Sequence, residues 1–259
     1  MSVILNSRTF GARGRPVVIL HGLFGSLENW ASQARALSDE FNVTALDLRN
    51  HGQSPHDDQM GYADMAEDVV ATMDNLNIDR AHIVGHSMGG KTAMQLALDF
   101  PTRARTLTVV DIAPRRYARH HDAIFDALTA LDTASLKSRQ VADAAIIDAV
   151  PELAVRSFLL KNLQRTETGF AWKMNLQVLI DEYESIAAAV ESDVPFQNQT
   201  LFIKGSASEY IQTNDTPTIQ KLFPNARAKI IDGAGHWPHV EKADVFTRIL
   251  RGFLSQDST

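Results

Sequence analysis

The sequence predicts an α/β fold with a mostly parallel central sheet, helices on both of its faces and one helical insertion. Short runs of β-branched residues and leucine alternate along the chain with helical patterns, as repeated βαβ units require. This alternation stops between about Pro114 and Pro195, where helical patterns follow one another. A chain of 259 residues, 44% of them hydrophobic, is long enough to bury one large core. We therefore expect a single main domain that carries an insertion.

Most of the expected strands are apolar along their whole length, which is typical of parallel strands covered on both faces. The segment 3–8 is expected to form an edge strand. Because helices connect the other strands through right-handed crossovers, those strands should run parallel. They are expected at residues 17–20, 43–46, 82–84, 107–112, 201–203 and 228–231.

Helical periodicity fills the spaces between these strands. The clearest helices are expected at residues 62–76, 88–99 and 242–254, and Pro101 ends the second of them. Between Pro114 and Pro195 the helical patterns continue without a convincing strand. We therefore expect residues 1–113 and 196–259 to form the core domain, and residues 114–195 to form a helical cap, or lid, over the sheet.

Charge and composition narrow the class of function. A formal net charge of -6 argues against a protein whose main task is to neutralise nucleic-acid phosphates. The absence of cysteine excludes disulfides and thiolate metal sites. The first residues lack a signal-peptide pattern, and no segment approaches the ~20 apolar residues of a membrane span. We expect a cytoplasmic protein that acts on a small molecule, and the composition does not predict its oligomeric state.

The segment VGHSMGG places Ser87 between Gly85 and Gly89, after an apolar run and before a helical pattern. In a sharp strand-to-helix turn a serine projects its hydroxyl toward solvent only if the flanking residues carry no clashing side chain. Chance alone would produce Gly-x-Ser-x-Gly roughly 0.05 times in such a chain, so the motif is only suggestive without its context. The strand before it and the helix after it point to a nucleophile rather than to an ordinary turn serine.

A serine nucleophile needs a base that accepts its proton and a third group that orients the base. His236 lies in the segment DGAGHWPHVEK, where Gly233 and Gly235 allow a loop to reach the edge of the sheet. We therefore favour His236 as the base over His239, which is expected to cap or pack at the start of the next helix.

The acid is expected to be Asp111, which follows a buried apolar run in the segment TVVDIAP. A carboxylate at that position has little structural reason to be there unless a partner pairs with it. The chain order of Ser87, Asp111 and His236 also fits the order of nucleophile, acid and histidine in sites of this kind. Glu209, Asp215 and a purely structural Asp111 remain as alternatives.

Two backbone N–H groups must stabilise the negative oxygen that forms on the substrate. Met88, the residue after the nucleophile, is expected to supply one of them. The segment LHGLFGS forms a flexible loop in which Leu23, or less readily Phe24, is expected to supply the other. His21 would then hold this loop by a hydrogen bond. An unremarkable βα loop is the alternative.

The segments LHGLFGSLENW, LDLRNHGQSP, GHSMGGKTAM, VVDIAP and GAGHWPHVEK occur in this order, and with them the chain resembles the α/β-hydrolase superfamily along nearly its whole length. More narrowly, it resembles the bacterial YbfF-type esterases. The resemblance implies an α/β-hydrolase fold with the cap inserted after the sixth strand, where the acid would also lie. It further implies serine hydrolysis of esters or thioesters with short to medium acyl chains, acyl-CoA among them.

Substrate contacts are expected from the cap and from residues that flank the catalytic segments. Phe24 and Trp237, together with Met88, are expected to line the acyl site. Arg115 and Arg116, in the segment PRRYARHH, are candidates for binding the phosphates of coenzyme A, because guanidinium groups bind phosphate through paired hydrogen bonds. The alternative is a solvated helical turn in which these arginines and Arg119 pair with Asp122 and Asp126.

No cofactor and no metal are expected. The segment FGARGRP lacks the third glycine of a dinucleotide fingerprint. His120, His121 and Asp122 resemble a set of metal ligands, but adjacent histidines on a helix point away from each other. The segment 47–51 is expected to brace a loop beneath the site.

Other reactions on the same scaffold remain open alternatives to ester hydrolysis. They are C–C bond hydrolysis, elimination by a lyase mechanism, and perhydrolysis. A binding module that has lost its activity is disfavoured, because Ser87, His236 and an acid are all present.

Overall fold

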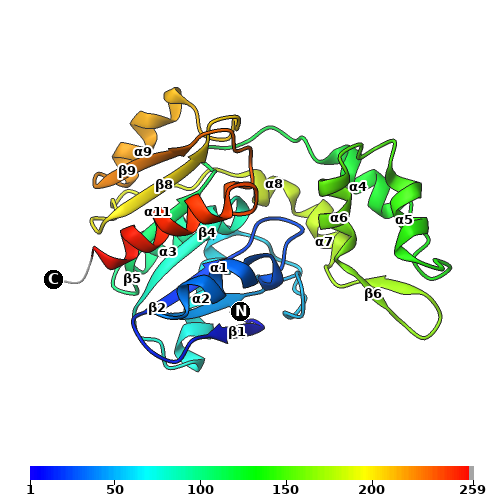
Figure 1. The fold of residues 1–259 in the computed structure, drawn as a ribbon, viewed down its shortest axis with the longest axis horizontal. Helices are drawn as coiled ribbons and strands as arrows, with labels where there is room; N and C mark the ends of the chain where they lie inside the picture. Colours follow the sequence, from blue (N-terminus) through cyan, green and yellow to red (C-terminus); the bar gives the residue numbers. More distant parts are fainter. Residues whose placement is uncertain (257–259) are drawn as a thin grey trace.

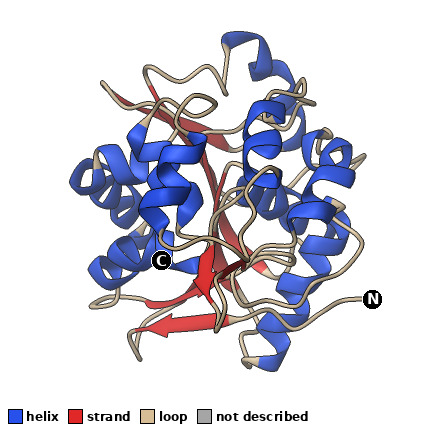
Figure 2. Cartoon of the chain, turned by 90° about the vertical axis from the view of Figure 1, so that its right-hand side faces the viewer, coloured by secondary structure: helices blue, strands red, loops and turns tan. Residues whose placement is uncertain are grey.

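A computed structural model describes residues 1–256 of the chain. A twisted sheet runs through the centre of the molecule, and helices cover both of its faces (Figures 1 and 2). The predicted α/β fold is thereby confirmed.

The strands are β1 (Ser7–Phe10), β2 (Pro16–Leu20), β3 (Asn42–Leu46), β4 (Ala81–His86), β5 (Ala104–Val110), β6 (Leu163–Arg165), β7 (Phe170–Trp172), β8 (Thr200–Gly205) and β9 (Ala226–Ile231). The α-helices are α1 (Ala31–Leu37), α2 (Tyr62–Asn75), α3 (Met88–Asp99), α4 (Asp122–Thr129), α5 (Arg139–Ile146), α6 (Leu153–Leu160), α7 (Leu176–Asp181), α8 (Tyr183–Ala187), α9 (Thr216–Leu222), α10 (Pro238–Glu241) and α11 (Ala243–Ser255).

The central sheet has seven strands in the order β1-β3-β2-β4-β5-β8-β9. Strand β1 runs antiparallel to its neighbour, and all the other neighbouring pairs of this sheet are parallel. Strand β4 lies in the middle and every one of its residues is buried. Because the parallel strands all end at the same edge, the loops that follow β2, β4, β5, β8 and β9 meet there.

Two hydrophobic cores lie on opposite faces of this sheet. On one face α1 and α11 pack on the sheet through Leu37, Phe246 and Leu250. On the other face α2 and α3 pack on the sheet through Met65 and Leu96, and this core continues into the segment between β5 and β8. The sheet is therefore covered on both sides, which accounts for the continuous apolar runs of its central strands.

The segment between β5 and β8 contains α4 to α8, and most of it lies to one side of the central sheet (Figure 1). It is not entirely helical, because β6 and β7 form an antiparallel hairpin. The expectation of an insertion without strands was therefore wrong. Each strand of the hairpin has only three residues, which is too short to produce a recognisable alternating pattern.

The first strand of the chain also differs from the expectation. The backbone N–H of Val3 donates to Asp68 Oδ1 at 2.7 Å, and that of Leu5 donates to Thr72 Oγ1 at 2.9 Å. These bonds hold the first residues against α2, so β1 begins only at Ser7. Since the chain before β2 forms this single short strand, the insertion follows the fifth strand of the chain, and not the sixth as the resemblance implied.

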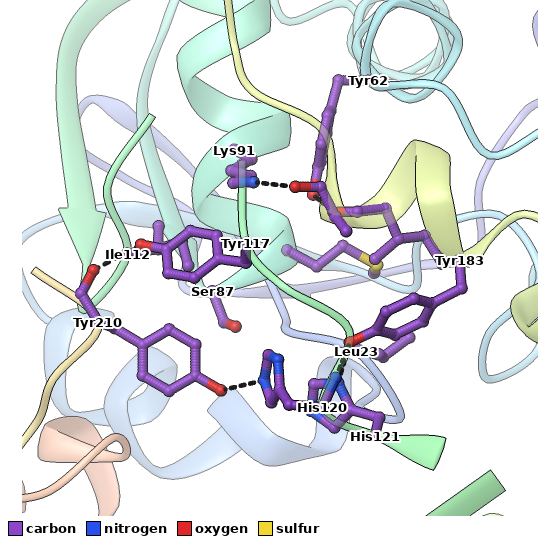
Figure 3. A pocket seen from close by; sticks show the side chains of 13 residues that line it. Leu23, Tyr62, Ser87, Lys91, Ile112, Tyr117, His120, His121, Tyr183 and Tyr210 are labelled. Atoms are coloured by element: carbon purple, nitrogen blue, oxygen red, sulfur yellow. Dashed lines mark hydrogen bonds between the residues drawn. The ribbon is translucent and has the colours of Figure 1, made fainter. Parts of the chain in front are cut away.

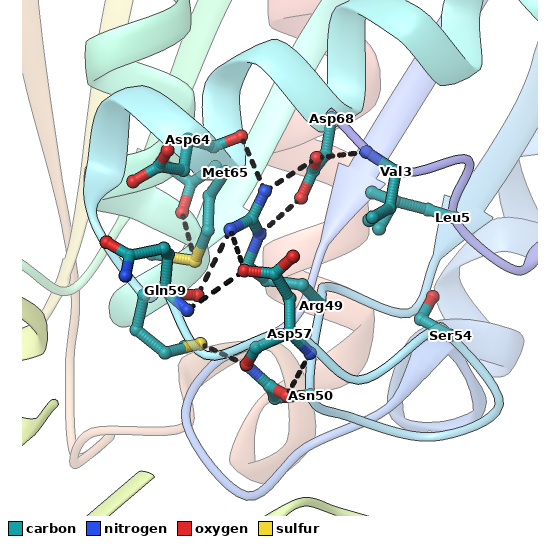
Figure 4. A network of polar contacts seen from close by, with 12 residues as sticks. Val3, Leu5, Arg49, Asn50, Ser54, Asp57, Gln59, Asp64, Met65 and Asp68 are labelled. Carbon is teal, nitrogen blue, oxygen red and sulfur yellow. Dashed lines mark hydrogen bonds and ion pairs between the residues drawn. The ribbon is translucent and has the colours of Figure 1, made fainter. Parts of the chain in front are cut away.

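A buried ionic network braces the loop that follows β3, as the sequence predicted for this segment (Figure 4). Arg49 is only 1% exposed, and its guanidinium donates to both carboxylate oxygens of Asp68 at 2.6 and 2.8 Å. It also contacts Asp57 at 3.2 Å and the backbone oxygen of Gln59 at 3.1 Å. Because Asp68 also accepts from the N–H of Val3, one ion pair joins the start of the chain, the loop and α2.

None of the helices formed by residues 1–256 combines the length and the apolar composition that crossing a membrane requires.

We predict that Asp68→Ala lowers the free energy of unfolding by about 3–5 kcal/mol, because it leaves the charge of Arg49 buried without its main partner. Urea or guanidinium denaturation measures this loss. Asp57→Ala is the matched control, since it removes a partly exposed carboxylate and leaves the bidentate pair intact, and it should cost much less. Equal losses in the two variants would contradict this account.

Candidate active site

Ser87 lies in the turn between β4 and α3, at the carboxyl edge of the sheet. Its backbone has φ 52° and ψ −120°, a conformation that residues with side chains rarely adopt. A Cβ on Gly85 would lie 2.0 Å from the carbonyl oxygen of Gly89, and a Cβ on Gly89 would lie 2.3 Å from that of His21. Glycine at position 85 therefore lets the turn close, and glycine at position 89 lets it pack against the end of β2.

The structure brings Ser87, His236 and Asp111 together in one hydrogen-bonded chain. His236 Nδ1 lies 2.8 Å from Asp111 Oδ2, and His236 Nε2 lies 3.1 Å from Ser87 Oγ. Since the carboxylate accepts the proton on Nδ1, Nε2 is free to accept the serine hydroxyl proton. This is the geometry that a serine nucleophile and its base require.

Asp111 is fully buried, and its carboxylate accepts hydrogen bonds from elements that follow later in the chain. In addition to His236, the hydroxyl of Ser208 donates to Oδ2, and the backbone N–H of Gly205 donates to Oδ1 at 3.1 Å. The two acidic alternatives lie elsewhere. Glu209 is exposed, and Asp215 forms an ion pair with Arg115 at 3.1 Å.

Tyr210 and Ser208 are site residues that the sequence analysis did not identify. The ring of Tyr210 stacks on the imidazole of His236, with centroids 3.8 Å apart and an angle of 17° between the planes. Burial raises the pKa of Tyr210 to about 12, so its phenol stays neutral at physiological pH. Its backbone N–H donates to the hydroxyl of Ser208 at 3.2 Å. A hydroxyl and an aromatic ring in one loop carry no sequence signal for this arrangement.

Two other histidines near the site are buried and hold the surrounding structure. His239 stacks on Trp30, with ring centroids 4.3 Å apart, and burial lowers its pKa to about 3. His86 contacts the backbone oxygen of His236 at 2.8 Å, and burial lowers its pKa well below the usual value. His239 is thus placed in a packing position, whereas His236 contacts Ser87.

The loop after β2 carries both candidates for the second N–H group. The N–H of Phe24 donates to His51 Nε2 at 3.3 Å, while His51 Nδ1 donates to the backbone oxygen of Arg49. Burial lowers the pKa of His51 to about 3, which keeps Nε2 available as an acceptor. Because the amide of Phe24 is occupied, the geometry favours Leu23 over Phe24 as the partner of Met88.

Two cavities meet at Ser87. The larger has a volume of about 690 Å³ and is lined by His236 and by apolar side chains from α6 and the flanking loops. Phe24 and Trp237 are among these lining residues, as are Val155 and Phe158 of the insertion. An apolar cavity of this size is typical of a site for a small organic molecule.

The smaller cavity has a volume of about 40 Å³ and extends from Ser87 and Met88 toward α2 and α8 (Figure 3). Its walls carry a high proportion of polar aromatic residues, among them Tyr62, Tyr117 and Tyr183. Lys91, one helical turn beyond Ser87, also lines this cavity. The two cavities therefore differ in size and in the side chains that line them.

The arginines expected to bind phosphate lie outside the residues that line either cavity. Each is paired with a carboxylate: Arg115 with Asp215, and Arg116 with Glu184. The sequence analysis considered ion pairs of these arginines and Arg119 with Asp122 and Asp126. Of these, the pair between Arg119 and Asp122 is present in the structure.

His120 and His121 do not point away from each other, as expected for neighbours on a helix. They precede α4, and their ring centroids are 4.1 Å apart. His120 Nε2 contacts the hydroxyl of Tyr210 at 2.8 Å, and His121 Nδ1 contacts that of Tyr183 at 2.6 Å. Among residues 1–256, no group of three metal-ligating side chains is arranged to hold an ion.

Comparison with known proteins gives consistent matches over almost the whole chain. A family model described as the alpha/beta hydrolase fold matches residues 15–243. The protein named esterase YbfF from Escherichia coli is 41% identical over 241 residues, an alignment that covers 93% of this chain and 93% of the relative. The sn-1-specific diacylglycerol lipase ABHD11 of Xenopus laevis is 38% identical over 253 residues, covering 93% of this chain and 80% of the relative.

A solved structure gives the same result. The protein described as a marine microorganism esterase superposes with a TM-score of 0.95 at 38% sequence identity. The superposition covers 97% of this chain and 100% of that chain.

We predict that Ser208→Ala slows covalent labelling of Ser87 by a fluorophosphonate about tenfold. A hydrogen bond to a charged group contributes roughly 1.5–3 kcal/mol, and its loss frees the Asp111 carboxylate to turn away from His236. Time-resolved mass spectrometry measures the rate. Ser206→Ala is the matched control, because Ser206 is exposed and bonds Asp232 rather than Asp111. A normal labelling rate in Ser208→Ala would assign Ser208 to loop structure alone.

Proposed function

The chain belongs to the α/β-hydrolase family, and from that premise we propose that it hydrolyses carboxylic esters through an acyl-enzyme formed on Ser87. The observation that carries this proposal is the hydrogen-bonded chain from Ser87 through His236 to Asp111. The names of the relatives, an esterase of Escherichia coli and a lipase of Xenopus laevis, point to the same class of reaction.

The proposed reaction proceeds in two halves on the same residues. Ser87 Oγ attacks the ester carbonyl while its proton passes to His236 Nε2, and the N–H groups of Leu23 and Met88 stabilise the negative oxygen. As the bond to the leaving group breaks, His236 returns the proton to the departing oxygen or sulfur. Water then attacks the acyl-enzyme and gives its proton to His236. His236 passes this proton to Ser87 Oγ as the bond between Oγ and the acyl group breaks, and the carboxylic acid leaves.

The position of His236 indicates how the substrate divides between the two cavities. The leaving group must come within reach of His236 Nε2, because that atom protonates it. His236 lines the large cavity and is not among the residues that line the small one. We therefore assign the leaving group to the large cavity, beside Phe24 and Trp237, which the sequence analysis had associated with the acyl chain.

The acyl group then occupies the small cavity beside Met88. A volume of about 40 Å³ accommodates roughly three water molecules, since one water needs about 10–15 Å³ of such space. The preferred acyl groups are therefore at the short end of the range that the family resemblance implies. Residues 114–195 act as a cap in this proposal, because Val155 and Phe158 cover the leaving-group cavity.

Thioesters of coenzyme A are the finer part of the proposal and depend on different residues. The phosphates of coenzyme A would have to compete with Asp215 and Glu184 for Arg115 and Arg116. Arg116 and Glu184 are both well exposed, and exposed ion pairs contribute little, so this competition is feasible.

We predict that Ser87→Ala lowers kcat by about 10⁶-fold on benzyl butyrate, because the acyl-enzyme cannot form. Asp111→Asn should lower kcat by about 10⁴-fold with an unchanged melting temperature, because His236 loses its orienting carboxylate. The matched control is Glu209→Gln, which changes an exposed carboxylate and should retain full activity. Release of benzyl alcohol measures all three variants. The reverse ranking of Asp111→Asn and Glu209→Gln would move the acid to the loop after β8.

We predict that Arg115→Gln combined with Arg116→Gln lowers kcat/KM for butyryl-CoA about tenfold and flattens its dependence on salt, because two cations near the phosphates are lost. Benzyl butyrate, which has the same acyl chain and no charge, should be hydrolysed as before. Arg8→Gln is the matched control, since Arg8 forms an exposed ion pair with Glu28. Equal losses on both substrates would assign Arg115 and Arg116 to the structure of the cap.

A further inference from the structure

Lys91 is a buried cation that the proposed reaction does not use. It lies on α3, one turn beyond Ser87, and is only 1% exposed. Its ammonium group donates to the backbone oxygens of Ala188 at 2.5 Å and Ala187 at 3.2 Å. An ammonium group has three donors, and among residues 1–256 the third has no oxygen or nitrogen acceptor. Lys91 therefore lines the small cavity with one hydrogen-bond donor unused (Figure 3).

The charge of Lys91 is also uncompensated. Within residues 1–256 no carboxylate forms an ion pair with it, and its ammonium lies 4.7 Å from the ring centroid of Tyr117 and 5.5 Å from that of Tyr62. The charged groups that act on it are Arg115 and Arg116, both of them cations. Burial, with a smaller contribution from these arginines, lowers the pKa of Lys91 to about 7. A buried charge without a partner is costly, so its place beside Ser87 calls for an explanation.

We propose that the small cavity recognises an acyl group that ends in a carboxylate, and that Lys91 binds this carboxylate. A carboxylate supplies both the missing acceptor and the missing negative charge, whereas an alkyl end supplies neither. The available space suits a short chain, such as the two methylenes and carboxylate of a succinyl group. This inference rests on the proposed function, because it assigns the acyl half of the substrate to that cavity.

The experiment compares three benzyl esters that share one leaving group. Monobenzyl succinate carries the carboxylate, benzyl succinamate replaces it with an uncharged amide of the same shape, and benzyl butyrate has an apolar end. We expect kcat/KM for the succinate to exceed that for the succinamate at least tenfold at pH 6. Lys91→Met should reduce this ratio to about one while benzyl butyrate is still hydrolysed.

The matched control is Lys204→Met. The ammonium of Lys204 also donates to a backbone oxygen, that of Ile211, but Lys204 lines neither cavity. The ratio of succinate to succinamate should therefore be unchanged in this variant. An equal loss of preference in Lys204→Met would show that net charge alone sets the ratio, and would overturn the proposal.

The pH dependence of the wild-type enzyme gives a second test that needs no variant. Lys91 carries its charge below a pKa of about 7 and loses it above, so the succinate preference should fall as the pH rises through 7. Burial raises the pKa of Tyr62 and of Tyr117, so these two neighbours do not titrate near pH 7. His236 acts on the same leaving group in all three esters, so its effect on kcat/KM is the same for each and cancels in the ratio.

The outcomes separate this inference from the proposed function. If benzyl butyrate is hydrolysed but the succinate has no advantage over the succinamate, the carboxylate site is contradicted and the esterase proposal stands. If Lys91→Met keeps the preference, another group binds the carboxylate and the proposal fails. If none of the three esters is hydrolysed by the wild-type enzyme, the proposed function itself is contradicted.

Discussion

The turn between β4 and α3 holds Ser87 at φ 52°, a conformation that costs on the order of 1–3 kcal/mol for a residue with a side chain. Hydrogen bonds on both sides offset this cost: the N–H of Ser87 donates to the backbone oxygen of Val110 at 3.1 Å, and its own backbone oxygen accepts from the N–H of Lys91 at 3.1 Å. The first bond ties the turn to the end of β5, immediately before Asp111. The turn therefore positions Ser87 and the neighbouring strand together.

Two other residues of the site also have left-handed backbones. Asp111 has φ 53° and directly follows β5, while Phe24 has φ 60° and lies in the loop after β2. Both strands are neighbours of β4 in the sheet. Strained residues tend to gather where a structure must aim particular groups at one point. Here the three positions direct a hydroxyl, a carboxylate and the loop that carries Leu23 toward the space above β4.

Buried charges in this protein fall into two groups. Arg49 and Asp68 neutralise each other through two hydrogen bonds, and Asp111 accepts three. Lys91 has carbonyl oxygens and aromatic rings as neighbours but, within residues 1–256, no carboxylate. Because Arg49, Asp68 and Asp111 all have charged or hydrogen-bonding partners within the chain, the missing partner of Lys91 points to a ligand.

Local patterns in the sequence determined much of the fold. The tight turn around Ser87 needs glycine at positions 85 and 89, because any side chain there would clash with nearby backbone, so the pair of glycines indicated the turn. The continuous apolar runs likewise indicated a sheet covered on both faces. The hairpin β6–β7 and the late start of β1 escaped these patterns, because three-residue strands have no period and side chains of α2 capture the first backbone N–H groups.

Tertiary structure alone decided which distant residues meet. Asp111 and His236 are 125 positions apart, and Tyr210 stacks on His236 from a third loop. The surroundings of Lys91 likewise come from α2, α8 and the segment after β5. Periodicity and spacing report on interactions within a turn or a strand, whereas these contacts depend on the order of strands in the sheet and on how the insertion folds back over its edge.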